Sequence, residues 1–85
     1  MDKLEEQLLN DAYIHCMETG NYEYRVTPAN QQSFINLVNT AQNLKDYGYI
    51  EKLSDNLVGK TAFLIPSQVS FSITYDGIEY VRSKR

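Results

Sequence analysis

The chain has 85 residues, of which 42% are hydrophobic and 22% are charged, with four glycines and two prolines. This composition excludes a collagen-like, low-complexity or intrinsically disordered protein, and the length predicts one small domain over residues 1–85 with a thin core. The net charge of −3 is unusual for a dedicated nucleic-acid binder, which more often carries a basic face.

The charge is unevenly distributed along the chain. Residues 1–24 carry six acidic side chains and one lysine, giving −5, whereas residues 25–85 carry seven basic and five acidic side chains, giving +2. Because the local field governs docking more than the net charge does, the acidic N-terminal segment weakens the case for DNA binding without excluding it.

A single cysteine, Cys16, cannot form an internal disulfide, and a small secreted scaffold normally carries several. The first twenty residues are interrupted by acids and have no apolar run typical of a signal peptide. The longest apolar run, 62–65, is far too short to cross a membrane. We therefore expect a cytoplasmic protein without membrane contact.

Residues 2–19 are predicted to form a helix. Asp2 and Glu5 have the spacing of a capping box, and Gly20 follows as a stop. An apolar stripe is predicted at Leu4, Leu8, Leu9, Ala12, Tyr13, Cys16 and Met17. Ile14 lies off this stripe, so we expect a lone exposed residue there, with a second contact surface as the alternative.

A short edge strand is predicted at Tyr22–Val26, where aromatic and branched residues alternate with charged ones. Thr27 then has the position of a helix cap and Pro28 that of the first helical residue. The following helix is predicted to run to Tyr47, before Gly48. Its apolar stripe comprises Phe34, Leu37, Val38, Ala41 and Leu44. Ser33 is a possible second cap, which leaves open one helix over 28–47 or two.

Residues 49–74 are predicted to be β structure, with a strand opening at Tyr49-Ile50. Turns are expected at 54–56 and at 59–60. Strict alternation at 69–74 predicts a half-buried strand, and Thr74 then caps a short helix over 75–81. The basic tail, 82–85, is expected to be frayed.

Two stretches carry a resemblance to a known family. One is Leu44-Lys45-Asp46-Tyr47-Gly48-Tyr49-Ile50, a helix end, a glycine stop and an aromatic strand start. The other is Phe71-Ser72-Ile73-Thr74-Tyr75-Asp76-Gly77-Ile78-Glu79-Tyr80-Val81, a strand, a threonine cap, a glycine and an apolar helix. Together they resemble winged helix-turn-helix domains of bacterial regulators, among them the small YjcQ-like family of bacilli and their phages. The resemblance covers residues 34–83.

The resemblance implies an α+β class: a single winged-helix domain with a helix, a short strand, one or two helices, a β-wing of two to three strands and a short C-terminal helix. One departure concerns the helix-turn-helix unit, because only residues 21–27 separate Gly20 from Pro28. The first helix of that unit is therefore compressed into 28–32, lost, or replaced by Tyr22–Val26. In such domains the second helix enters the DNA major groove.

Candidate DNA-contacting residues fall into two groups. Amides can pair bidentately with adenine, and the helix before the β region carries Gln32, Asn36, Asn39, Thr40 and Asn43 on one face, with Lys45 near its end. Phosphate contacts are expected from Lys52 and Lys60 in the wing and from Arg82, Lys84 and Arg85 in the tail. The alternative interpretation is that the amide-bearing helix face is an uncharged, solvated surface, and that the lysines and arginines are ordinary surface residues.

No catalytic, metal or cofactor site is expected. His15 and Cys16 are neighbours in a helix and point about 100° apart, so they do not form a nucleophile–base pair, and zinc needs more ligands than this chain offers. Cys16 is predicted to be a core thiol and His15 a surface or boundary residue. The seven tyrosines are expected to pack at the edges of the core.

These patterns favour a small DNA-binding protein over an enzyme. We expect a transcriptional regulator of bacterial or phage origin that binds double-stranded DNA and dimerises through its first helix. The alternative is an acidic winged-helix module that binds a protein partner and reads no DNA sequence, supported by the net charge and by the absence of arginine from the amide-bearing helix face.

Overall fold

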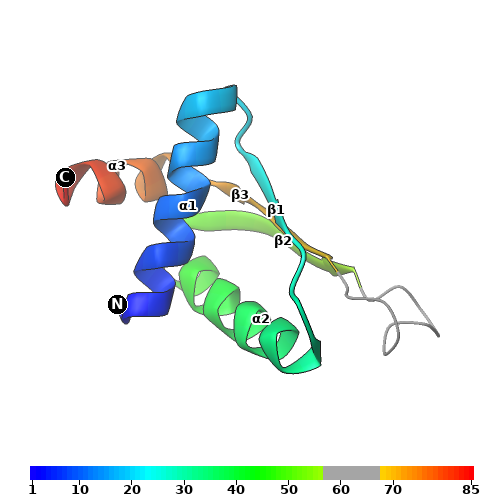
Figure 1. Ribbon diagram of the computed structural model, residues 1–85. Coiled ribbons are helices and arrows are strands. Elements are labelled where there is room, and N and C mark those ends of the chain that lie inside the picture. Colours follow the sequence, from blue (N-terminus) through cyan, green and yellow to red (C-terminus); the bar gives the residue numbers. More distant parts are fainter. Residues whose placement is uncertain (57–67) are drawn as a thin grey trace.

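The computed structural model describes residues 1–56 and 68–85 and has the predicted α+β class. In chain order the elements are α1 (Lys3–Thr19), β1 (Glu23–Val26), α2 (Gln31–Asp46), β2 (Ile50–Asn56), β3 (Gln68–Ile73) and α3 (Tyr75–Ser83). Figure 1 shows α1 in the middle of the molecule, where it contacts α2, α3 and the sheet. The turn predicted at 59–60 and the part of the predicted β region over 57–67 lie outside the described residues.

The sheet is antiparallel and its strand order is β1-β3-β2. The predicted edge strand is confirmed as β1, in which Tyr24 lies opposite Phe71 of the central strand. Alternation along β3 buries Val69, Phe71 and Ile73 and leaves the intervening serines half-buried on the other face. The strand therefore presents one apolar face to the helices, as its sequence pattern predicts.

Helix α1 begins and ends at the predicted residues. The Asp2 side chain accepts from the backbone of Glu5, the Glu5 side chain accepts from the backbone of Asp2, and Gly20 adopts a left-handed conformation with φ 75°. The predicted stripe is wrong at Leu4 and at Met17, which are 61% and 46% exposed. A strict four-residue repeat drifts by about 40° around a helix at each step, so Glu5 instead takes the innermost position of the first turn.

Helix α2 is a single helix, which settles the alternative left open by the sequence. Its N-cap is Asn30, whose side-chain oxygen accepts from the backbone of Ser33 at 2.8 Å. The predicted caps at Thr27 and Ser33 are therefore wrong. Pro28 is buried and precedes the helix, so its ring packs against the protein instead of starting the first turn.

The predicted turn at 54–56 is wrong, because these residues continue strand β2. Ser54 lies opposite Ser70 and Asn56 opposite Gln68. The pairing shifts register between Glu51 and Ser54, where Lys52 has a φ of 56°. This irregularity lets the strand continue, and pairing with β3 outweighs the turn preference of the local sequence.

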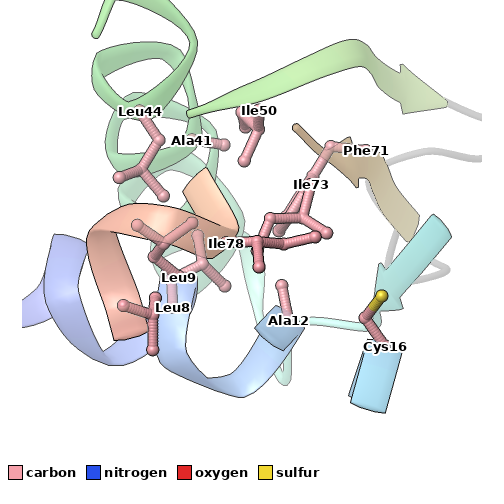
Figure 2. Packing of buried hydrophobic residues seen from close by; sticks show 11 residues of the cluster. Leu8, Leu9, Ala12, Cys16, Ala41, Leu44, Ile50, Phe71, Ile73 and Ile78 are labelled. Carbon is pink, nitrogen blue, oxygen red and sulfur yellow. The ribbon is translucent and has the colours of Figure 1, made fainter. Parts of the chain in front are cut away.

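The core lies between α1 and the sheet and is closed by α2 and α3. Figure 2 shows side chains from all of these elements converging, including Leu9 of α1, Leu44 of α2 and Phe71 of β3. Cys16 is 2% exposed and belongs to this cluster, as predicted. Tyr24 and Leu37 pack around its edge.

Thr74 connects three parts of the fold. Its hydroxyl donates to the Gly48 carbonyl at 2.7 Å and accepts from the Gly77 backbone at 3.0 Å, and its own N–H donates to the Tyr49 carbonyl. The predicted cap of the last helix is therefore confirmed, and the same residue also fixes the turn between α2 and β2.

Replacing Thr74 with valine, which keeps the shape and removes the hydroxyl, is expected to lower the free energy of unfolding by about 1 kcal/mol. The reason is that the Gly77 N–H and the Gly48 carbonyl both lose their partner. Urea unfolding of Thr74→Val and of the control Thr74→Ser measures the effect. Equal losses in the two variants would contradict a role for the hydroxyl.

Candidate functional site

The predicted amide face of α2 is only partly available to a ligand. Gln32, Asn36 and Asn39 are exposed, and the Gln32 amide donates to the Asn36 side chain at 3.1 Å. Thr40 is half-buried and its hydroxyl donates to the Asn36 carbonyl one turn earlier. Two amides and a threonine thus interact within their own helix.

Asn43, also predicted to contact DNA, has a structural partner. Its amide donates to Glu5 at 2.8 Å, and Glu5 is 4% exposed, the one charged side chain among the described residues that is buried. The Glu5 carboxylate also raises the pKa of Tyr47, with smaller contributions from burial and from a hydrogen bond between the two side chains. Asn43 therefore joins α2 to α1 while remaining exposed.

The predicted cations near α2 do not lie on its amide face. Lys45 follows Asn43 by two residues, which places it about 200° further around the helix. Lys52 is exposed in β2, at the point where the pairing shifts register. Lys60 lies outside the described residues.

The tail cations gather against α1. Arg82 forms an ion pair with Glu79 at 3.6 Å, and Arg85 donates to Asn10 at 3.0 Å and lies 5.0 Å from the centre of the Tyr13 ring. Helix α3 extends to Ser83, two residues beyond the end predicted at 81, and Arg85 after it contacts α1.

This end of α3 borders a shallow groove of about 420 Å³, lined in part by Lys3, Asn10, Lys84 and Arg85. Figure 1 shows the end of α3 on the opposite side of the molecule from the Asn56 end of β2 and the Gln68 end of β3.

Three tyrosines form a stack at a junction of elements. Tyr49 packs against Tyr47 with ring centres 5.7 Å apart and against Tyr80 at 4.8 Å. The Tyr80 hydroxyl donates to Glu6 at 3.0 Å, and burial, followed by this bond, raises the pKa of Tyr80. The stack links the end of α2, the start of β2 and α3 to α1. The predicted position at the edge of the core is confirmed for Tyr13, Tyr24, Tyr49 and Tyr80 and is wrong for Tyr22, Tyr47 and Tyr75, which are exposed.

One side of α1, between α2 and β1, carries an apolar and acidic surface that is exposed except at the half-buried Asp11. We call this surface the outer face of α1, and it comprises Leu4, Gln7, Asp11, Ile14 and Glu18. Leu4 is 61% and Ile14 37% exposed, so Ile14 is not the lone exposed apolar residue expected from the sequence. The sequence already shows the spacing of three and four residues that defines this surface. The surface was not predicted, because Leu4 was placed in the core stripe instead.

Two grooves flank the outer face of α1. One, of about 300 Å³, runs between α1 and α2, with Leu4, Leu8 and Leu37 in its lining. The other, of about 270 Å³, lies between α1 and β1 and includes Ile14 and Glu18. Asp11 borders both grooves.

His15 and Tyr24 close the second groove. Their ring centres are 5.2 Å apart, which places His15 at the boundary of the protein, as predicted. Burial raises the pKa of Tyr24, and the nearby Asp11 carboxylate raises it further. Asp11 and Glu18 form no ion pair among the described residues, where the pairs are Arg25–Glu23 and Arg82–Glu79.

Within residues 1–56 and 68–85, no cluster of three or more histidine, cysteine or acidic side chains has a metal-binding arrangement. In the same part of the chain, none of the helices has the length and apolar character needed to cross a membrane. A scan of protein-family models and searches of curated proteins and of solved structures each found no match to this chain.

Proposed function

We propose that this protein is a small winged-helix-like module that binds a protein partner through the outer face of α1. The observation that carries the proposal is the pairing of exposed Leu4 and Ile14 with carboxylates that have no ion-pair partner in the described chain. Exposed apolar side chains rimmed by polar groups are typical of protein interfaces.

The arrangement of elements supports the winged-helix part of the proposal. The helix α2 directly precedes the β2–β3 hairpin, and β3 lies between β1 and β2. A winged helix-turn-helix domain has two helices between its first helix and its hairpin, and these two form the helix-turn-helix unit. Here residues 27–30 are not helical, so that unit lacks its first helix. This loss favours a module whose main contact is made elsewhere.

Binding of double-stranded DNA by α2, as in a bacterial or phage regulator, is the second candidate function. It is favoured by the exposed amides of Gln32, Asn36 and Asn39 beside the hairpin. Phosphate contacts supply most non-specific affinity, and Lys52 is the one candidate cation in the described part of that hairpin. The first candidate therefore has the stronger electrostatic support.

Selection of binders from a displayed library of random peptides tests the first candidate. We expect enriched peptides whose affinity falls about tenfold for the Leu4→Ser/Ile14→Ser variant, because two apolar contacts are lost. The control Gln32→Ser/Asn39→Ser removes exposed side chains from α2 and is expected to leave binding unchanged. If no peptide is enriched, or if only the α2 variant loses binding, the proposal is wrong.

The same proteins are tested with a random DNA pool at about 50 mM and about 200 mM salt. A defined sequence motif whose binding weakens in the Gln32→Ser/Asn39→Ser variant would establish the second candidate. If the protein binds DNA without a common sequence motif, and this binding is lost at the higher salt, the result would indicate only general electrostatic attraction.

A further inference from the structure

The chemistry of the outer face of α1 indicates which kind of partner fits it, provided that the proposed protein-binding function holds. Its residues recur at intervals of three and four, which places them on one side of a straight helix. A second helix can pack along such a ridge, with its side chains entering the grooves on either side.

The charges on this face are negative and regularly spaced. Asp11 and Glu18 are seven residues apart, which is two turns or about 10 Å along the axis, and Ile14 lies between them. No described ion pair includes either carboxylate. A ligand that brings positive charge at the same spacing therefore gains attraction without breaking an existing contact.

The same charges disfavour two other occupants. A dimer through α1 was expected from the sequence, but antiparallel packing of two outer faces would bring Asp11 and Glu18 close to like charges. The phosphates of DNA or RNA would be repelled for the same reason. A partner with basic side chains avoids both problems.

We infer that the outer face of α1 binds a basic amphipathic helix of a partner protein. Large apolar residues such as leucine on one side of that helix cover Leu4 and Ile14. Lysine or arginine residues on its flanks approach Asp11 and Glu18. The groove beside Leu37 gives one apolar side chain of the partner a place to enter. This is the recognition of a helix along a groove by regularly spaced apolar anchors.

Fluorescence anisotropy with a labelled peptide of about 18 residues, designed with leucines on one face and lysines on both flanks, tests this inference. We expect saturable binding that weakens at least about tenfold in the Asp11→Lys/Glu18→Lys variant. The control Asp46→Lys/Glu51→Lys changes the net charge equally at exposed sites on α2 and β2, and is expected to retain binding.

A scrambled peptide of the same composition separates helix recognition from simple charge attraction. Equal binding of the scrambled peptide, or equal loss in both charge-reversal variants, would overturn the inference. If the library yields binders that depend on Leu4 and Ile14 but are acidic or non-helical, the protein-binding function stands and the inferred partner chemistry is wrong. Absence of any such binder would instead contradict the function itself.

Discussion

Replacing Gly77 with alanine is expected to lower the free energy of unfolding by about 3 kcal/mol, because overpacking against backbone cannot be relieved by a rotamer change. A Cβ atom at this position would overlap the Tyr49 carbonyl oxygen and would come within 3.0 Å of the Ile73 side chain. That carbonyl also accepts the Thr74 N–H, so α3 would have to move away from the start of β2. Urea unfolding followed by circular dichroism measures the loss.

Gly20 provides the matched control. It has a φ of 75°, and no atom lies within 4 Å of the place that a Cβ would take, so alanine there meets backbone strain but no overlap. We expect a loss of about 1 kcal/mol for Gly20→Ala, as is usual for a left-handed residue with a side chain. A loss for Gly77→Ala no larger than this would show that α3 can shift without cost.

The second large effect is expected at Asn43. Replacing it with leucine removes the donor to a buried carboxylate, which should lower the free energy of unfolding by about 2 kcal/mol. Replacing it with aspartate should cost more at pH 7, because two carboxylates would then lie side by side.

Asn39→Leu and Asn39→Asp are the controls, because Asn39 is an exposed amide on the same helix. Changes within about 0.5 kcal/mol are expected for both. In a double-mutant cycle, Glu5→Leu with Asn43→Leu should be less destabilising than the sum of the single variants, because the carboxylate and its donor are removed together. Additive effects would show that the two side chains do not stabilise the fold as a pair.

Local signals in the sequence predicted much of the fold. The capping box of Asp2 and Glu5, the alternation that ends at Ile73 and the cap at Thr74 are all short-range patterns, and each is confirmed. The glycine three residues after the Thr74 cap was visible as part of the family resemblance. The structure supplies its physical reason, which is the close approach of α3 to the Tyr49 carbonyl.

Other features depend on contacts that the sequence order does not reveal. Asn43 resembled a base-reading amide because its helix face is polar, yet its partner Glu5 lies 38 positions away in the chain. Arg85 resembled a free phosphate contact, yet it bonds to Asn10 in the first helix. In both cases a hydrogen-bond acceptor on α1 is the partner that positions the side chain.

The start of α2 was mispredicted for a different reason. Thr27 followed by Pro28 is a favourable local helix start, but the ring of Pro28 is buried and the cap falls at Asn30. Burial of the proline thus outweighed the local capping preference. The turn expected near Ser54 was wrong because pairing with β3 extends β2 beyond it.

The strand order affects how the domain forms during synthesis on the ribosome. Strands β1 and β2 each pair with β3 and are not neighbours in the sheet, and β3 follows both in the chain. Neither strand can find its partner until Gln68–Ile73 has been synthesised, so α1 and α2 emerge first, without the sheet that covers their apolar sides. Sheet closure is thus a late step, and a nascent chain that ends before β3 exposes the apolar side of α1 to chaperones and proteases.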